Sequence, residues 1–298
     1  MIKDYLNKIG KELKGKNEDS IEYKIYKTEL TKRLEKDLKN NNPDKILNDY
    51  VEYFSQKELK TIRIKKGAEF YRGRIGSKVV QGAIDDFNTQ FIMPYYGGMI
   101  EAAPPLYTSG GRFNRAGISY LYLSTDIETC FAEVHLQVGQ ECSIAKFKCI
   151  NDIELINLSD FGNDLELKAW YEILTQPVHD EIKYKYFITQ FIAEVLMKLN
   201  SNGLYFKSVQ STGNNIVCFK PHNFELITYS EKLFMAQKLR YEYIQVEDAI
   251  RKFAKRDDTH LINDLNTDLV EENEKQIEFL NEWIEKEKVF KTKINYIE

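Results

Sequence analysis

The sequence predicts an α+β fold in which a mixed β core with helices is flanked by helical segments at both ends. Apolar residues recur at helical spacing in residues 1–66 and again in residues 231–298. Between them, residues 67–230 contain short runs rich in β-branched and aromatic residues, the usual composition of strands. We therefore divide the chain into an N-terminal helical region, a central domain and a C-terminal helical extension at these boundaries.

The composition is that of a folded protein and does not suggest a polyanion-binding one. Of its 298 residues, 43% are hydrophobic and 30% are charged, and the formal net charge is −4. Residues 1–66 carry 17 Lys and Arg against 12 Asp and Glu, but the two signs are interspersed. We interpret this as a solvated helical surface, and we expect no direct binding of nucleic acid.

The cysteines and the apolar segments indicate a cytoplasmic location. The four cysteines are scattered without a Cys-x-x-Cys pair, so neither a zinc site nor a disulfide framework is expected. No stretch approaches the roughly 18 apolar residues of a membrane span, and the N-terminus lacks an apolar signal segment. We expect reduced thiols and no membrane association.

Local signals place the main elements. Asp19-Ser20 is a plausible N-cap for one helix, and Asn42-Pro43 starts another. Helices are also expected at about 127–138, 164–174 and 184–199. Helical spacing returns from residue 231, with stripes of apolar residues between 243 and 253 and between 277 and 284. Strands are expected at 68–72, 119–124, 143–149, 153–158, 203–206, 215–219 and 224–229.

A glycine-rich stretch in the central domain is the strongest candidate for a binding loop. Five of the 15 glycines lie between residues 97 and 117, and long shaped loops inside compact domains are often functional. Within it, Gly110-Gly111 and Asn114 favour a turn around Arg112. A guanidinium held beside exposed backbone amides suits a pyrophosphate.

Four other side chains have both an ordinary and a functional interpretation. Arg72 ends a strand-like run and would be either a surface ion-pair residue or an anion ligand. Tyr122 alternates with two leucines and would be either core or a platform for a planar ring. Glu133 lies at the margin of the apolar face of the helix predicted at 127–138, and Ser208 precedes a turn where serine often caps. No nucleophile elbow surrounds this serine, so a serine hydrolase is not expected.

Taken together and in order, these segments resemble the RES domain family. The resemblance spans roughly 67–230 and is carried by Phe70-Tyr71-Arg72, Ala103-Pro104-Pro105, Gly111-Arg112-Phe113-Asn114, Leu121-Tyr122-Leu123-Ser124, Ala132-Glu133, Gln176-Pro177-Val178, Tyr186-x-x-Thr189-Gln190, Gly203-Leu204-Tyr205-x-x-Ser208 and Gly213-x-Asn215. The arginine, glutamate and serine that name the family would be Arg72, Glu133 and Ser208. One extra residue precedes Ser208 compared with the usual family pattern.

The resemblance implies a toxin with an ADP-ribosyltransferase-like fold that consumes NAD⁺ as its substrate, by hydrolysis or phosphorolysis, with no metal or other cofactor. It also implies a partner, an antitoxin with an Xre-type helix-turn-helix. Glu133 would stabilise the oxocarbenium-like ribose, with Arg72 and Arg112 on the pyrophosphate. The remaining substrate-binding residues would be Tyr71, Tyr122, Ser208 and Asn215.

Two alternatives remain at this stage. Within the same fold, a protein side chain could accept the ADP-ribose in place of water or phosphate, which would make the protein a mono-ADP-ribosyltransferase. The chain could also be a non-catalytic nucleotide-binding module that makes contacts through its helical ends. The sequence leaves homo-oligomerisation open, and it lacks the Arg-x₄₋₆-His signature of a HEPN ribonuclease.

Overall fold

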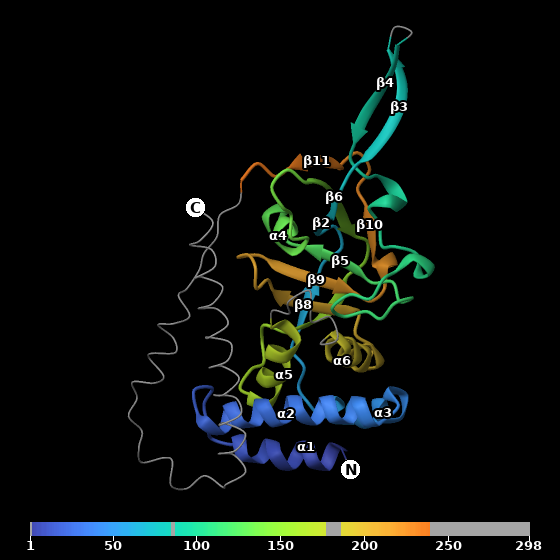
Figure 1. Cartoon of the computed structure of the whole chain (residues 1–298). Helices are drawn as coiled ribbons and strands as arrows, with labels where there is room; N and C mark the ends of the chain where they lie inside the picture. The colour runs from blue at the N-terminus through green and yellow to red at the C-terminus, as the bar shows by residue number, and fades with distance from the viewer. Residues whose placement is uncertain (1, 85–86, 177–185, 239–298) are drawn as a thin grey trace, which may run out of the picture. The chain divides into compact units, whose positions relative to one another are not determined.

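The computed structural model describes residues 2–84, 87–176 and 186–238, all within one compact unit that ends at Leu239. Figure 1 shows a sheet with helices packed against it, and the predicted α+β class is confirmed. The helical stripes predicted between residues 243 and 284 lie outside the described residues. None of the described helices is long and apolar enough to cross a membrane.

Nine of the described strands form one mixed sheet in the order β1-β7-β8-β9-β5-β2-β6-β10, and β11 pairs with a second part of β6. The pairing is antiparallel except between β7 and β8. The strands are β1 (Thr61–Ile64), β2 (Glu69–Ile75), β5 (Leu121–Ser124), β6 (Glu141–Cys149), β7 (Ile153–Asn157), β8 (Gly203–Lys207), β9 (Asn214–Cys218), β10 (Phe224–Leu226) and β11 (Lys232–Met235). A separate hairpin consists of β3 (Lys78–Ile84) and β4 (Phe87–Met93).

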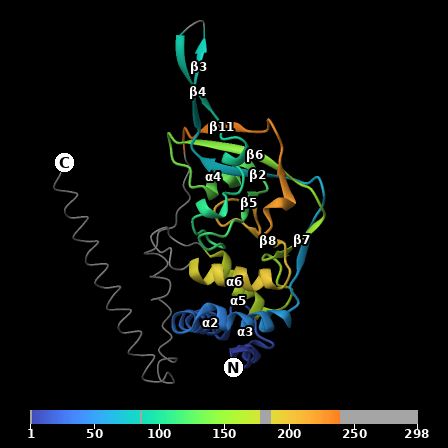
Figure 2. The same ribbon diagram turned by 90° about the vertical axis from the view of Figure 1, so that its right-hand side faces the viewer.

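Helices cover both faces of this sheet. On one face lie α5 (Leu165–Thr175) and α6 (Tyr186–Lys198), and the N-terminal helices α1 (Ile2–Gly10), α2 (Ile21–Asn40) and α3 (Pro43–Ser55) pack beyond them (Figures 1 and 2). The short α4 (Ile127–Glu133) packs on β2, β5 and β6. Single 3₁₀ turns occur at Lys11–Leu13, Gly97–Met99, Pro105–Tyr107 and Pro221–Asn223.

Two of the predicted helix starts have the expected caps. The Ser20 side chain accepts a hydrogen bond from the Tyr23 backbone N–H at the start of α2. Asn42 does the same for the Asp44 N–H, directly before Pro43 at the start of α3. Each cap satisfies a backbone donor that the first turn of a helix leaves without a partner.

The N-terminal helices share one hydrophobic core with α5 and α6. Trp170 of α5 is fully buried, and its ring centroid lies 5.2 Å from that of Phe54 and 6.1 Å from that of Tyr50, both on α3. Lys57, just after α3, forms an ion pair of 2.9 Å with Glu166 of α5. Residues 2–55 therefore pack as part of the central fold.

Apart from shifts in strand ends, the structure differs from the sequence prediction in four places. Strand β1 lies within residues 1–66, which were predicted to be helical, and β11 lies beyond residue 231, where helices were expected. The β3–β4 hairpin was not predicted. Helix α4 ends at Glu133, not near residue 138, because the next residues turn and His135 has a left-handed backbone with φ of 52°.

Candidate active site

A pocket of about 260 Å³ opens where β2, β5, β9 and α4 meet the loop around Arg112. Six of the seven site residues predicted from the sequence line it, namely Tyr71, Arg72, Arg112, Tyr122, Glu133 and Asn215. The seventh, Ser208, contacts the pocket through its hydrogen bond to Glu133. Three strands, one helix and two loops thus bring the predicted residues together.

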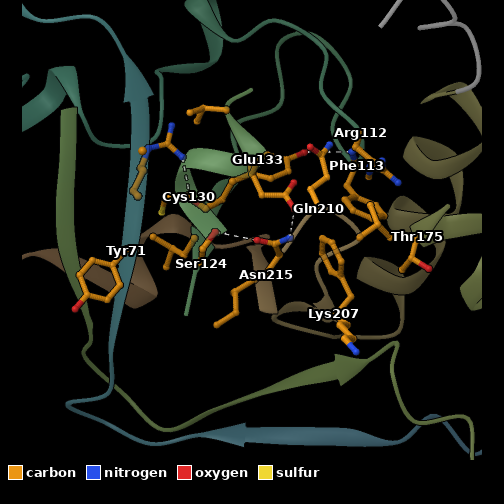
Figure 3. Close-up of a pocket in the computed structure, with 18 of the residues that line it drawn as sticks. Tyr71, Arg112, Phe113, Ser124, Cys130, Glu133, Thr175, Lys207, Gln210 and Asn215 are labelled. Carbon is orange, nitrogen blue, oxygen red and sulfur yellow. Dashed lines mark hydrogen bonds between the residues drawn. The ribbon is translucent and has the colours of Figure 1, made fainter. Parts of the chain in front are cut away.

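Glu133 is the last residue of α4, and its carboxylate is held on one side only. Its Oε1 atom accepts a hydrogen bond of 2.7 Å from the Ser208 hydroxyl. It accepts another of 2.7 Å from the Asn215 amide (Figure 3). Within the described part of the chain, no hydrogen bond to Oε2 is formed. One oxygen is therefore anchored, and the other can meet a ligand in the pocket.

The Ser208 hydroxyl can donate its one proton only to Glu133. It is buried, and its Oγ accepts hydrogen bonds of 3.1 Å from the backbone N–H groups of both Gln210 and Ser211. A hydroxyl has two lone pairs and one proton, so the proton goes to Glu133. The turn is closed by the Ser208 N–H, which donates to the Gly213 carbonyl at 2.9 Å.

Asn215 is oriented by Ser124, a residue that the sequence analysis did not place in the site. The two lie directly opposite each other on β9 and β5, and both are buried. A carboxylate accepts only, so the Asn215 NH₂ must face Glu133 and its Oδ1 must face Ser124. The Ser124 hydroxyl then donates to Oδ1 at 2.8 Å (Figure 3). The only local signal for Ser124 was a small polar residue ending an otherwise apolar strand.

Arg72 is fixed by backbone carbonyls at the wall of the pocket. Its Nε donates to the Ile100 carbonyl at 2.7 Å and its Nη1 to the Tyr122 carbonyl at 3.1 Å. Burial lowers the pKa of the Arg72 guanidinium to about 10, and the neighbouring Arg74 acts in the same direction. The group still stays protonated at neutral pH, and these two bonds use two of the five N–H donors of a guanidinium.

Arg112 is held in a similar way at the opposite wall. Its Nη1 donates to the Leu174 carbonyl at 3.2 Å and to the Gln176 carbonyl at 2.9 Å, and the guanidinium lies 5.9 Å from the centroid of the Tyr186 ring. These carbonyls end α5, so the cation also meets the negative end of the helix dipole. Both arginines are therefore rigid cations.

Tyr122 holds the loop that carries Arg112. Its hydroxyl donates to the Asn114 Oδ1 at 2.7 Å and accepts from the Phe113 N–H at 3.2 Å. A side chain at Gly111 would place its Cβ 2.6 Å from that Oδ1 and 3.1 Å from the Tyr122 hydroxyl. Glycine is therefore required in the predicted Gly110–Asn114 turn because the turn lies very close to β5.

Helix α6 holds the same loop from its other side. Gln190 donates from Nε2 to the Gly111 carbonyl at 2.7 Å, and the Thr189 hydroxyl donates to the Arg112 carbonyl. Both residues belong to motifs noted in the sequence, but they were not counted as site residues. Through these contacts with main-chain atoms, both side chains help to position the loop that carries Arg112.

Cys130 also lines the pocket. Burial raises the pKa of its thiol to about 12, which disfavours the reactive thiolate at neutral pH. The described residues contain no group of three or more His, Cys, Asp or Glu side chains that could hold a metal ion. The acidic side chain in the lining of this pocket is that of Glu133, and its basic side chains include those of Arg72, Arg112 and Lys207.

Comparison with known proteins gives one family. The chain is similar to a chain from the crystal structure of the M. tuberculosis MbcT–MbcA toxin–antitoxin complex, at 12% identity and a TM-score of 0.37, covering 65% of this chain and 94% of that one. No curated protein matches the sequence. The RES domain model matches residues 91–243, which include five of the predicted site residues. The match begins within β4, so Tyr71 and Arg72 on β2 lie outside it. Because the match covers just over half of the sequence, the chain belongs to the RES domain family.

Proposed function

We propose that the protein binds NAD⁺ in this pocket and cleaves the bond between nicotinamide and ribose. The observation that carries the proposal is Glu133, a carboxylate with one anchored oxygen in the same pocket as two fixed guanidinium groups. A dinucleotide has matching features, since its pyrophosphate is anionic and its reacting ribose becomes cationic.

The reaction needs little from the protein except position and charge. Nicotinamide leaves as a neutral molecule, so no general acid has to protonate it. The ribose becomes oxocarbenium-like as the bond breaks, and Glu133 Oε2 is the atom that would stabilise this charge or orient the ribose hydroxyls. The electron pair of the broken bond leaves with nicotinamide. Water then forms the new bond to the same carbon and loses a proton to solvent, or phosphate forms this bond through one of its ionised oxygens. NAD⁺ is the substrate in this scheme, and no other cofactor takes part.

The arginines supply the binding part of the proposal. Arg112 and Arg72 are cations whose positions are set by main-chain carbonyls, so little side-chain entropy is lost when they meet a phosphate. Charge-assisted hydrogen bonds of this kind contribute about 1.5–3 kcal/mol each. The two arginines would therefore bind the pyrophosphate before the bond between nicotinamide and ribose breaks.

Membership of the RES family supports a biological role as a cytoplasmic toxin. We infer that the protein depletes NAD⁺ in a bacterial cell and is neutralised by an antitoxin protein, which for this family we expect to be of the Xre type. Expressing the wild-type chain should lower cellular NAD⁺ and stop growth. Growth arrest with unchanged NAD⁺ would contradict this role.

The direct test is to incubate the purified full chain with NAD⁺, with and without inorganic phosphate, and to identify the products. Nicotinamide with ADP-ribose indicates hydrolysis, and nicotinamide with ADP-ribose 1″-phosphate indicates phosphorolysis. Label from NAD⁺ retained on protein would point instead to mono-ADP-ribosylation. Binding of NAD⁺ without release of nicotinamide would overturn the proposal and leave a nucleotide-binding module.

Arg112→Ala is expected to raise KM for NAD⁺, so that kcat/KM falls about 10- to 100-fold, the equivalent of one charge-assisted hydrogen bond. Steady-state kinetics with a thermal melt of each variant checks this, because Arg112 also holds the end of α5. Arg112→Lys keeps the charge and should lose less. A lower melting temperature with an unchanged KM would show that Arg112 is only a structural residue.

Ser124→Ala is expected to lower kcat about 5- to 10-fold with little change in KM, the effect of about 1 kcal/mol from one hydrogen bond. Without the serine hydroxyl, the Asn215 amide can rotate and turn its oxygen toward Glu133. Ser124→Thr keeps a hydroxyl and should recover most of the loss. Equal losses in both variants, at similar melting temperatures, would exclude this positioning role.

A further inference from the structure

The β3–β4 hairpin is rooted firmly in the sheet but has no partner along its length. Among the described strands, β3 pairs with β4 alone, and Figures 1 and 2 both show the two strands extending beyond the edge of the main sheet. At the root, the buried Ser143 of β6 donates to the Gly76 carbonyl at 2.7 Å and accepts from the Tyr95 N–H at 2.9 Å. The arm therefore has a fixed base.

Its surface is unusually apolar for a segment that extends into solvent. Val79 and Ile92 lie directly opposite each other on one face and are 52% and 57% exposed. Phe91 and Met93 lie on the other face and are 39% and 43% exposed. Of the fifteen large hydrophobic side chains exposed in the described chain, these four lie on the hairpin, and two more, Ile75 and Tyr96, flank it in the sequence. Such a concentration marks an interaction surface.

The outer edge of β4 also lacks the usual protection against pairing. Its seven residues, Phe87–Met93, include neither a charged residue nor a proline, whereas β3 carries Lys78. Natural edge strands are commonly blunted by lysine, proline or bulges, because an open edge pairs with other strands. A two-stranded hairpin alone is also only marginally stable in water. Both facts favour a further strand beside β4.

We propose that this further strand is β4 of a second copy of the chain, which would join two hairpins into a four-stranded sheet. An uncharged strand meets its own copy without like-charge repulsion and offers no charge by which to select a different partner. Two identical edges related by a twofold axis run antiparallel, the arrangement of a continuous antiparallel sheet. Gln90 is the central residue of β4 and would face Gln90 of the second copy.

The first test is the mass of the full chain in solution by sedimentation at micromolar concentrations. The wild type is expected to be a dimer, and Ile92→Lys should weaken dimerisation at least tenfold, because it places a charge beside the paired edge. The matched control is Ile25→Lys on α2, which changes a side chain that is 56% exposed elsewhere and should leave the dimer intact. A monomeric wild type, or equal weakening by both substitutions, would overturn the proposal.

The second test identifies the paired edge. All four native cysteines are buried, so Gln90→Cys adds an accessible thiol at the proposed axis. Mild oxidation should convert this variant to a covalent dimer faster than Ile25→Cys. If the wild type is dimeric but the two variants cross-link equally slowly, the dimer uses another surface and the proposed pairing is wrong.

Discussion

Glu133→Gln is expected to remove most NAD⁺ cleavage while the fold and the affinity for NAD⁺ are kept. Glutamine has nearly the volume of glutamate, and its carbonyl oxygen can still accept from Ser208 and Asn215. The negative charge beside the developing oxocarbenium ion is lost. Removal of one well-placed electrostatic group costs about 2.7–4 kcal/mol in the transition state, or about 10²- to 10³-fold in kcat. Product analysis gives the turnover, and calorimetric titration gives the affinity.

Glu128→Gln provides the matched control for this prediction. Glu128 lies on the same helix as Glu133, but it is exposed and does not line the pocket. Its substitution makes the same change in net charge and should leave turnover unchanged. Near-normal turnover in the Glu133 variant would remove this carboxylate from the mechanism.

The sequence was most informative where function depends on local chemistry. Glycines beside Arg112, an acidic residue at the margin of a helix and a serine before a turn are visible within a few residues, and the fold brings all three to one pocket. Family resemblance supplied their order along the chain.

Contacts between strands that are far apart along the chain give much weaker signals in the sequence. Ser124 acts on Asn215, 91 residues away, and nothing near either residue indicates the pairing of β5 with β9. Strand β1 has only four residues, one of which is the charged Arg63. It forms a strand because it pairs with β7. The hairpin was missed for a related reason, since its two strands have little of the alternation that a half-buried strand shows.

Trp170→Ala is expected to lower the free energy of unfolding by about 3–5 kcal/mol, the usual cost of deleting a large buried aromatic side chain. Trp170 is fully buried between α5 and α3, and its indole N–H donates to the Tyr53 hydroxyl at 3.3 Å. Alanine would leave a cavity and remove that donor. Chemical denaturation of the full chain measures the change. Phe187→Ala on α6 is the control, because Phe187 is 39% exposed and should cost much less.

This prediction tests whether the N-terminal helices belong to the core that supports the pocket. The carbonyls of Leu174 and Gln176 at the end of α5 position Arg112, and α5 in turn packs on α3 through Trp170. Loss of the indole should therefore reduce the folded fraction on warming, while molecules that remain folded keep their KM for NAD⁺. A loss below about 1 kcal/mol, within the range of surface substitutions, would mean that the contact between α5 and α3 contributes little to the stability of the fold.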